Sequence, residues 1–501
     1  MNAALPVVVI GAGPVGLAAA AHLLERGLIP LVLEAGDRVG AGMLRWAHVR
    51  MFSPWHYSID RAARALLERH GWQAPDPNGF PTGGELVAQY LRPLAALPEI
   101  ASHLRLGARV LAVSRERHDV MKDADRAGAP FLVRYEDADG EHELRARAVI
   151  DASGTIETPN PLGASGLPAI GERALREHIA YGMPDVLGAD RARYAGKRVL
   201  VVGSGHSAFN VLSDLARLSE QAPGTTIQWA LRRHTLRRVL GGGDADQLKE
   251  RGKLGMTIAR LVQDGVLQVA TGFHLERLER TADGIVAYDG KRALAPVDEI
   301  VGATGFRPDL GVLSEVRLAL DPGTQAPAAL APLIDPNLHS CGSVRPHGAE
   351  ELKHPDADVY IVGMKSYGRA PTFLLLTGYE QVRSVVAAID GDWDAARRVE
   401  LVLPETGVCI TDFGDEEVAA NASSCCTPAA REPIAASCCG PAPAAEAPIA
   451  AASADCCGGP APIGADACCV ADVEAKAVGQ AGCGCGPKPA VAPAVVASCC
   501  G

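Results

Sequence analysis

The most constraining feature of this chain is a glycine-rich stretch near its start, "PVVVIGAGPVGLAAAAHLLERGLIPLVLEAG". A short apolar run leads into three glycines and an alanine-rich segment closed by Gly27, and a second apolar run ends at Glu34. This order predicts a strand, a tight turn, a helix and a parallel strand. A membrane span or signal peptide is excluded, because glycines and a proline interrupt the apolar run and no basic residue precedes it.

Each glycine of this motif has its own role in a dinucleotide-binding turn. Gly11 makes the tight turn, Gly13 lets the backbone approach a pyrophosphate, and Gly16 lets the helix pack on the strand. The helix N-terminus offers oriented N–H groups to the phosphates. Glu34 accepts hydrogen bonds from a ribose diol and repels a 2′-phosphate. The residues therefore predict FAD or NAD at this unit and exclude NADP.

The same pattern recurs in "KRVLVVGSGHSAFNVLSDLARL". Its three glycine positions are held by Gly203, Gly205 and Ala208, the third being the permitted alanine. The next predicted strand is followed by a basic cluster, Arg232, Arg233 and Arg237. Guanidinium groups bind a 2′-phosphate in bidentate fashion, so this unit is predicted to bind NADPH. A solvated basic loop is the alternative.

Two short segments, "AVIDASGT" (148–155) and "EIVGATGFRPD" (299–309), each predict a buried strand followed by a turn of small residues. With both glycine motifs and the late "VYIVGMKSYGRAPTFLLLTGYEQVRSVVAAI", they resemble the flavin-containing monooxygenase and thioredoxin-reductase-like superfamily over residues 5–400. The resemblance implies an α/β fold with two Rossmann-like dinucleotide-binding domains, the NADPH domain being inserted in the FAD domain. The expected parts are the first FAD part (1–160), the NADPH domain (161–305), the second FAD part (306–400) and a tail (401–501).

The resemblance also implies further FAD contacts. "HVRMFSPWHYSID" resembles the monooxygenase segment that wraps the flavin, which suggests Ser53 and Trp55, a buried aromatic cluster being the alternative. In the late motif, the resemblance implies that Gly363, Thr377 and Gly378 also contact FAD. Many relatives continue there with Gly-Asp at the ribityl chain, whereas this chain has Met364 and Lys365. A helix from about Thr377 would stabilise the anionic reduced flavin with its N-terminal dipole.

The chain departs from both branches of the superfamily. The Phe-x-Gly-x-x-x-His fingerprint of monooxygenases is missing before the second glycine motif, and His178 there is interpreted as an ordinary surface residue. A thioredoxin reductase with its own core dithiol is excluded, because Cys341 and Cys409 stand alone and no Cys-x-x-Cys precedes the tail. No residue is an obvious catalytic acid or base.

Cys341, His347 and His354 invite a metal interpretation, but their spacing fits no zinc pattern, which favours structural or substrate-lining roles. "LPETG" (403–407) resembles a sortase signal without its apolar anchor and basic tail, and it is taken as the end of the folded part. After about Asp415 the chain is rich in alanine, proline, glycine and cysteine and is predicted to be disordered.

Twelve of the fourteen cysteines lie in this tail, mostly as adjacent pairs. They are Cys425, Cys426, Cys438, Cys439, Cys456, Cys457, Cys468, Cys469, Cys483, Cys485, Cys499 and Cys500. Adjacent Cα atoms are about 3.8 Å apart, below the roughly 4.4 Å floor of an ordinary disulfide, so both thiols of a pair stay available. They suit a thiophilic ion, with zinc and Cu(I) as candidates. A low-complexity tail without a selected role is the alternative.

A flavoprotein core with "VGMKSYGRAPTF" and a paired-cysteine tail resembles the flavin monooxygenase-like proteins associated with arsenic-resistance genes. That resemblance implies arsenite or an organoarsenical as the handled species. Composition limits other partners. The net charge of −11 and the lack of a basic run interleaved with aromatics exclude nucleic acid. Without an export signal or membrane anchor, we expect a cytoplasmic protein whose cysteines serve metal or redox chemistry.

Three hypotheses follow. The first is an NADPH-dependent FAD oxidoreductase of the monooxygenase type that acts on a metalloid or other small-molecule substrate. In the second, the same core passes electrons to the cysteine pairs of the tail. In the third, the tail sequesters or delivers metal and the core only tethers it. The sequence leaves open the electron acceptor, the ion and the oligomeric state.

Overall fold

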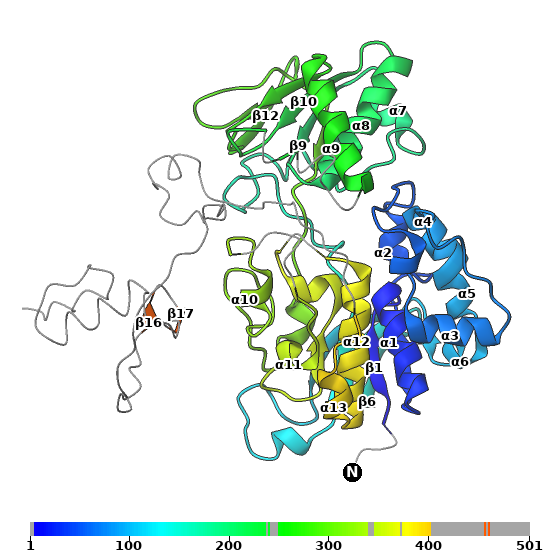
Figure 1. The fold of residues 1–501 in the computed structure, drawn as a ribbon. Helices are drawn as coiled ribbons and strands as arrows, with labels where there is room; N and C mark the ends of the chain where they lie inside the picture. Colours follow the sequence, from blue (N-terminus) through cyan, green and yellow to red (C-terminus); the bar gives the residue numbers. More distant parts are fainter. Residues whose placement is uncertain are drawn as a thin grey trace, which may run out of the picture. The chain divides into compact units, whose positions relative to one another are not determined.

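The computed structural model describes residues 5–236, 239–240, 249–338, 345–370, 373–401, 455–456 and 459–460. The chain divides into two units, residues 1–423 and residues 424–501. The first unit contains two five-stranded parallel sheets with associated helices (Figure 1). This arrangement confirms the predicted α/β class with two Rossmann-like units. The predicted tail lies outside the described residues, apart from residue 401 and two short antiparallel strands, β16 (Asp455–Cys456) and β17 (Gly459–Pro460).

The first sheet has the strand order β15-β7-β1-β2-β3. Its strands are β1 (Val7–Ile10), β2 (Pro30–Leu33), β3 (Leu104–Arg105), β7 (Ala148–Asp151) and β15 (Val359–Ile361). These strands are apolar because both faces of the sheet are covered. Val7 and Val9 pack into one core with the helices, and Val8 and Ile10 pack into a second core on the other face.

Helices cover the first of these faces. α1 (Pro14–Glu25) packs against α12 (Leu375–Asp390), beside which it runs in Figure 1, and against α3 (Arg61–Arg69). The alanine run of α1 is fully buried, since small side chains allow neighbouring helices to approach closely. The shorter helices of this part are α2 (Ala41–Leu44), α4 (Gly83–Leu86), α5 (Arg92–Ala95), α6 (Pro98–Ala101), α10 (Ala331–Ile334), α11 (Ala349–Leu352) and α13 (Trp393–Arg397).

A three-stranded antiparallel sheet covers the other face. It consists of β4 (Arg109–Arg115), β5 (Phe131–Asp137) and β6 (Gly140–Ala146). The inward side chains of β4 and β5 alternate with exposed ones, and Val113, Phe131 and Val133 join Val8 of β1 in one core. The alternation is the pattern expected of an antiparallel sheet with one solvated face.

The second parallel sheet has the order β11-β10-β9-β14-β8. Its strands are β8 (Ile179–Tyr181), β9 (Arg198–Val202), β10 (Thr226–Ala230), β11 (Leu267–Ala270) and β14 (Glu299–Gly302). Its helices are α7 (Arg191–Tyr194), α8 (His206–Gln221) and α9 (Lys249–Gln263), and a hairpin is formed by β12 (Arg277–Thr281) and β13 (Gly284–Tyr288). Phe209, Leu212 and Leu215 of α8 pack with Trp229 of β10.

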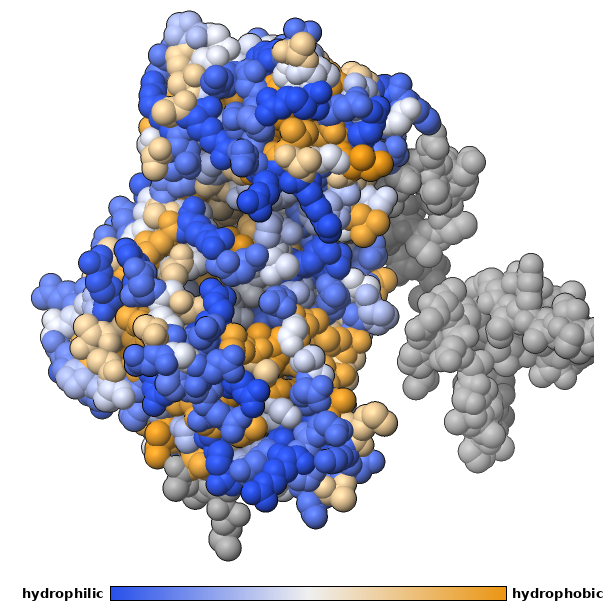
Figure 2. All heavy atoms as spheres, turned by 180° about the vertical axis from the view of Figure 1, so that it is seen from behind, coloured by the Kyte–Doolittle hydropathy of each residue, from blue (hydrophilic) through white to orange (hydrophobic). Residues whose placement is uncertain are grey.

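The chain order matches an inserted second sheet. Strands of the first sheet lie before residue 152 and after residue 358, and those of the second lie between 179 and 302. The exact limits of the predicted domains stay a prediction. On the face shown in Figure 2, hydrophilic residues surround scattered apolar patches. None of the described helices has the length and apolar character needed to cross a bilayer.

Candidate functional site

The first glycine loop joins β1 to α1 and has both crowded and open positions. Gly11 has a φ of +97°, and a Cβ there would lie 2.9 Å from the Ala152 carbonyl oxygen. A Cβ on Gly16 would clash with the Gly11 carbonyl oxygen, whereas one on Gly13 would have no atom within 4 Å. Packing therefore requires glycine at Gly11 and Gly16, and Gly13 faces the space that a ligand would enter.

The N-terminus of α1 is suited to an anion. Gly13 is its N-cap and provides no side-chain hydrogen bond, Pro14 follows it, and the first turn has no acidic residue. The N–H groups of a first helical turn have no partner within the helix, and the helix dipole favours negative charge there. This end of α1 thus fits a pyrophosphate.

Glu34 follows β2 and points to the glycine loop. Its carboxylate accepts hydrogen bonds from the backbone N–H groups of Ala12, at 2.6 Å, and Gly36, at 2.8 Å. A carboxylate has about four acceptor positions, so capacity remains for the hydroxyls of a ribose. The two backbone bonds fix the carboxylate beside the predicted phosphate position.

The second glycine loop, between β9 and α8, repeats this design. Gly203 has a φ of +133°, and a Cβ there would clash with the Ala303 carbonyl oxygen. Gly205 is the N-cap of α8 without a side-chain bond, and a Cβ on it would have no atom within 4 Å. Ala208 is fully buried at the position of the third glycine. The second loop therefore also presents an open glycine at an uncapped helix end.

The two βαβ units differ in the residue that follows their second strand, β2 in the first and β10 in the second. The Gly11 N–H donates to the Leu33 carbonyl, and the Gly203 N–H donates to the Ala230 carbonyl. The register therefore places Leu231 where the first unit has Glu34. Arg232 and Arg233 follow; Arg232 is exposed, and its Nη1 donates to the Ala164 carbonyl at 3.1 Å. Arg237 lies outside the described residues.

The two crossing segments meet near these loops. Ala152, after β7, packs on Gly11, and Ala303, after β14, packs on Gly203. Asn160 joins the crossings, since its carbonyl accepts from Thr304 Oγ1 at 2.6 Å and its Nδ2 donates to the Thr304 carbonyl at 3.1 Å. The chain just after the first crossing, at Asn160, therefore contacts the second crossing.

The late segment packs on the first glycine loop. Cβ atoms built on Gly363 and Gly378 would lie 3.2 Å and 2.7 Å from Cγ2 of Val15, inside the loop's helix. α12 begins at Leu375, earlier than the expected start at about Thr377. The N–H groups of Thr377 and Gly378 both donate to the Leu374 carbonyl, so they are not directed at a ligand. The roles of Gly363, Thr377 and Gly378 as cofactor contacts stay predictions.

A buried ion pair next to this segment was missed in the sequence. Lys365 Nζ lies 2.7 Å from Asp151 Oδ2 and 3.0 Å from Ser153 Oγ, and the lysine and aspartate side chains are 2% and 0% exposed. Asp151 ends β7 in the first crossing, and Lys365 follows β15. The only sequence signal for this pair was a single charged residue in each of two apolar runs, Asp151 in "AVIDASGT" and Lys365 in "VYIVGMKSYG". The pair ties the late segment to the first crossing.

Trp55 and Ser53 are both buried. Trp55 belongs to the core around α1, as the aromatic-cluster alternative expects, and its contact with FAD, like that of Ser53, stays a prediction. Phe52, in the same segment, contacts His206 at the start of α8, with ring centroids 5.3 Å apart. The segment predicted to wrap the flavin thus contacts the second glycine loop.

His178 lies away from the second glycine loop. It precedes β8, and its Nδ1 is 3.3 Å from Glu299 at the start of β14, whereas Gly203 follows the far end of the neighbouring strand β9. His178 also contacts Arg280. Its position at the opposite edge of the sheet agrees with an ordinary surface residue.

The possible metal residues are not assembled within the described part of the chain, where no group of three His, Cys, Asp or Glu side chains is arranged to hold an ion. His347 donates from Nδ1 to the Arg345 carbonyl and accepts at Nε2 from Gln381. Burial lowers the pKa of His347 and lowers that of His354 to about 4, which keeps both rings neutral. Cys341, Cys409 and the tail cysteines other than Cys456 lie outside the described residues, and only the backbone of Cys456 is described.

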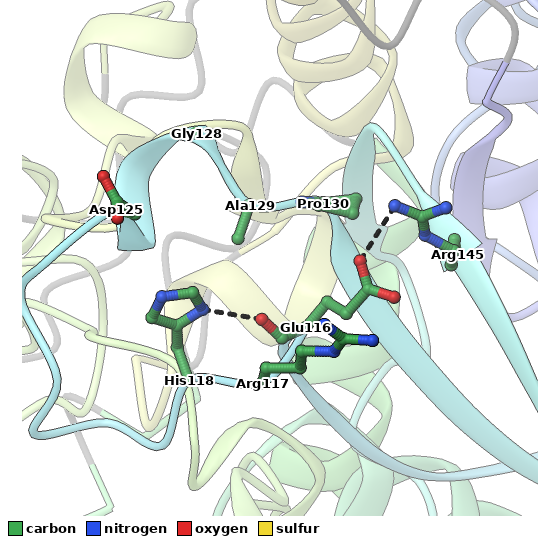
Figure 3. A pocket seen from close by; sticks show the side chains of 8 residues that line it. All are labelled: Glu116, Arg117, His118, Asp125, Gly128, Ala129, Pro130 and Arg145. Atoms are coloured by element: carbon green, nitrogen blue, oxygen red, sulfur yellow. Dashed lines mark hydrogen bonds and ion pairs between the residues drawn. The ribbon is translucent and has the colours of Figure 1, made fainter.

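A separate open cavity of about 660 Å³ lies at the edge of the three-stranded sheet (Figure 3). It is lined by Glu116, Arg117, His118, Asp125, Gly128, Ala129, Pro130 and Arg145. Arg145 forms an ion pair of 2.8 Å with Glu116, and His118 contacts the Glu116 carbonyl, as drawn in Figure 3. None of its lining residues was predicted to bind a cofactor.

Comparisons with known proteins agree with this geometry. Residues 8–330 match the family model described as pyridine nucleotide-disulphide oxidoreductase. The rice (Oryza sativa subsp. japonica) indole-3-pyruvate monooxygenase YUCCA1 is 32% identical over 214 residues, which are 42% of this chain and 45% of that protein. The ferredoxin–NADP reductase of Salinispora tropica is 28% identical over 320 residues, 63% of this chain and 78% of that protein. The chain thus spans less than half of the rice relative.

Solved structures show the same fold at low identity. The bacillithiol disulfide reductase Bdr from Bacillus cereus has a TM-score of 0.57 at 19% identity, covering 77% of this chain and 99% of that chain. The FAD-bound cadaverine monooxygenase DfoA from Erwinia amylovora has a TM-score of 0.56 at 16% identity, covering 81% and 98%. These structural matches show the fold, and together with the family model and the rice monooxygenase they bear out the resemblance to the flavin monooxygenase and thioredoxin-reductase-like superfamily. Because the family model covers most of the chain, this protein belongs to the pyridine nucleotide-disulphide oxidoreductase family.

Proposed function

We propose that this protein is an NADPH-dependent FAD oxidoreductase of the flavin monooxygenase type. The observation that carries the proposal is the pair of open glycines, Gly13 and Gly205, each at an uncapped helix N-terminus. Glu34 lies beside the first loop, and Leu231 with two arginines lies beside the second. The first loop therefore fits FAD and the second fits NADPH.

The residues around the loops would bind and orient the two coenzymes. Glu34 would accept the adenosine ribose hydroxyls of FAD, and Arg232 and Arg233 would bind the 2′-phosphate of NADPH. In this proposal the FAD domain comprises 1–160 and 306–400, and the NADPH domain comprises 161–305. When bound, FAD would supply the hydride acceptance and the onward electron transfer to oxygen or another acceptor.

The relatives support this assignment by their names. They include monooxygenases from plants, ferredoxin–NADP reductases and an FAD-bound cadaverine monooxygenase. The family name also includes disulphide reduction, for which a pair of thiols beside the flavin is required. No cysteine occurs before Cys341 in this chain, which favours an acceptor other than a dithiol of the core.

The tail suggests the substrate class. Twelve cysteines in six clusters suit a soft ion that takes two or three thiolates, and trivalent arsenic is such an ion. We therefore propose arsenite or an organoarsenical as the species handled by the full chain. The same cysteines favour a second candidate function, in which reduced flavin passes electrons to a tail disulfide.

The coenzyme assignment is tested by replacing Arg232 and Arg233 together with alanine. The purified chain should be yellow and should prefer NADPH over NADH. In the double variant, the ratio of kcat/KM for NADPH to that for NADH should fall at least tenfold, because the 2′-phosphate loses its cationic partners. The matched control is Arg134→Gln, since Arg134 is an exposed arginine on β5 that pairs with Glu143 on β6. Unchanged selectivity in the double variant would contradict the assignment.

The two candidate functions are separated by a full-length variant in which all twelve tail cysteines are serine. If oxygen is the acceptor, its NADPH-dependent oxygen consumption should match that of the wild type. If electrons pass through the tail, NADPH oxidation with a disulfide acceptor should fall at least tenfold. Arsenite binding to the two proteins, measured by calorimetry, tests the proposed role of the thiols in either case.

A further inference from the structure

The strand order of the first parallel sheet reverses between β1 and β7. From β1 the chain continues to β2 and β3 on one side, and β7 and β15 lie on the other. β1 pairs in parallel with β2 and with β7, and β7 pairs in parallel with β15, so the carboxyl ends of these strands share one edge. Ligands of such sheets bind outside the carboxyl ends, at the point where the strand order reverses. The edge between β1 and β7 is therefore a position where this sheet can bind a ligand.

Ser153 lies at this point of the edge. It follows β7, and a Cβ built on Gly11, which follows β1, would lie 3.0 Å from the Cα of Ser153. Ser153 is exposed, and the sequence motifs did not predict that it binds a coenzyme. Glu34 follows β2 on the far side of β1, and Lys365 follows β15 on the far side of β7. The strand ends thus present Glu34, the glycine loop, Ser153 and Lys365 in this order.

The hydroxyl of Ser153 is held from two sides. It donates to Asp151 Oδ1 at 2.6 Å and accepts from Lys365 Nζ at 3.0 Å. The Ser153 N–H also donates to Asp151 Oδ1, at 3.1 Å, and Lys365 Nζ donates to Asp151 Oδ2 at 2.7 Å. A serine hydroxyl has one proton and two acceptor positions. The proton and one acceptor position are used here, so Ser153 presents one remaining acceptor position to a ligand.

The ion pair that holds Ser153 is costly to bury. The side chains of Lys365 and Asp151 are 2% and 0% exposed. A buried ion pair adds little stability over apolar residues of the same volume, because both charges lose their water. The two partners come from neighbouring strand ends, and Ser153 contacts both of them. The distinctive product of the pair is thus an exposed hydroxyl that two buried side chains fix in one orientation.

A hydrogen-bond acceptor at this position discriminates among the groups of FAD. The phosphate oxygens of FAD are acceptors themselves, so the remaining position of Ser153 suits a hydroxyl instead. FAD has hydroxyls on its adenosine ribose and on its ribityl chain, with the pyrophosphate between them. Glu34 lies on the other side of the glycine loop and suits the ribose, and the pyrophosphate fits the open Gly13. Ser153 therefore lies on the ribityl side.

We propose that Ser153 accepts a hydrogen bond from a ribityl hydroxyl of FAD, and that Lys365 and Asp151 are positioning residues that orient it. The identity of the coenzyme rests on the proposed function, whereas the oriented hydroxyl rests on the contacts of the three side chains. Lys365 and Asp151 act through Ser153, so each has an effect on FAD binding that its contribution to stability does not explain.

Titration of the full-length apoprotein with FAD, followed by flavin fluorescence, tests the contact without turnover. Ser153→Ala should bind FAD about fivefold more weakly than the wild type, the loss expected of one hydrogen bond, and should melt at the wild-type temperature. The control is Ser102→Ala, which removes an exposed hydroxyl that donates to the Pro98 carbonyl and should leave FAD affinity unchanged. Equal affinity in the wild type and Ser153→Ala would overturn the proposal but not the proposed function. A wild type that binds no FAD would overturn both.

Competition by ADP identifies the half of FAD that Ser153 contacts. ADP has the adenosine and the pyrophosphate but no ribityl chain, so its affinity for the FAD site should be the same in the wild type and in Ser153→Ala. Glu34→Gln should weaken the binding of ADP and of FAD alike, because it acts on the ribose. Weaker ADP binding to Ser153→Ala would assign the serine to the adenosine half and overturn the proposal.

Substitution of the ion pair separates positioning from a structural tie. Lys365→Met leaves Asp151 buried without its cation, so the melting temperature and the FAD affinity should both fall. Adding Asp151→Asn removes the buried charge and should restore the melting temperature. The double variant should still bind FAD about as weakly as Ser153→Ala, because the hydroxyl is no longer held from two sides. Wild-type FAD affinity in the double variant, whatever its melting temperature, would show that the pair only joins two segments and would overturn its positioning role.

Discussion

The two glycine loops have almost the same backbone and different chemistry beside it. In each, the first glycine packs on an alanine carbonyl of a crossing segment and the second is an open helix N-cap. The third position is Gly16 in one loop and Ala208 in the other, and the residue after the second strand is Glu34 in one and Leu231 in the other. The comparison separates the residues that build a dinucleotide loop from those that select the dinucleotide.

The largest expected effect concerns the third position. In Gly16→Ala the new Cβ would clash with the Gly11 carbonyl, a backbone atom that moves only with its loop. We expect a loss of about 3 kcal/mol in the free energy of unfolding, together with loss of flavin. Ala208→Gly, which makes the second loop resemble the first, should cost about 1 kcal/mol. Denaturant unfolding of both variants checks the difference, and equal losses would show that the Gly11 carbonyl does not restrict the third position of the first loop.

Gly13→Ala is the matched control in the first loop. Its Cβ would face open space and its φ of −77° suits alanine, so stability should change by less than about 1 kcal/mol. The added methyl would nevertheless lie where the backbone approaches a pyrophosphate. Retained stability with at least tenfold weaker FAD binding is the expected result. Unaltered flavin binding would place the cofactor elsewhere.

The sequence was sufficient to predict the local features of the two loops. The βαβ units, both glycine motifs and both crossings follow from apolar periodicity and glycine spacing, which act over a few residues. It was insufficient for contacts set by strand order. Lys365 meets Asp151 only because β15 pairs with β7, and Leu231 is recognised as the counterpart of Glu34 only from the hydrogen-bond register. The start of α12 was misjudged because its first turn, Leu375 and Leu376, extends an apolar run that reads equally well as a strand.

The two loop helices also differ in a titratable residue at the same position. His22 in α1 and Asp214 in α8 each lie nine residues after the N-cap glycine. His22 Nε2 lies 3.0 Å from Asp60 Oδ2, and both side chains are buried. Burial alone would lower the pKa of His22, but the charge and hydrogen bond of Asp60 outweigh it and raise the pKa to about 9. The protonated ring therefore ties α1 to α3, which Asp60 caps.

A raised folded-state pKa gives stability that is present below the unfolded pKa of 6.5 and is lost as the pH rises through about 9. The wild type should lose about 3 kcal/mol of unfolding free energy over this interval. His22→Gln should be less stable than the wild type at pH 6 and lack this part of the slope. His70→Gln is the control: His70 is exposed at the end of α3, and this variant should keep the pH slope of the wild type. Parallel pH profiles for the wild type and His22→Gln would refute the role of the pair.

A smaller effect is expected from exchanging the selecting residue. Leu231→Glu places a carboxylate at the register of Glu34, where it would repel a 2′-phosphate and accept ribose hydroxyls. The preference for NADPH over NADH should fall about tenfold, which is about 1.4 kcal/mol. Leu231 is buried, so Leu231→Gln is needed to measure the cost of a polar side chain at this position. The same preference in both variants would show that the register does not determine selectivity.

The smallest effect concerns Asp214, the counterpart of His22. Burial raises its pKa, and the nearby Arg217, 3.4 Å away and largely exposed, only partly opposes this. A raised carboxyl pKa means that the ionised form at neutral pH weakens the folded state, so Asp214→Asn should raise the melting temperature at pH 7 by about 1–2 °C. The gain should shrink as the pH is lowered towards the ordinary carboxyl pKa, since both states then bind the proton. A lower melting temperature at pH 7 would mean that the ion pair with Arg217 outweighs burial. The ionised Asp214 would then stabilise α8, as the protonated His22 stabilises α1.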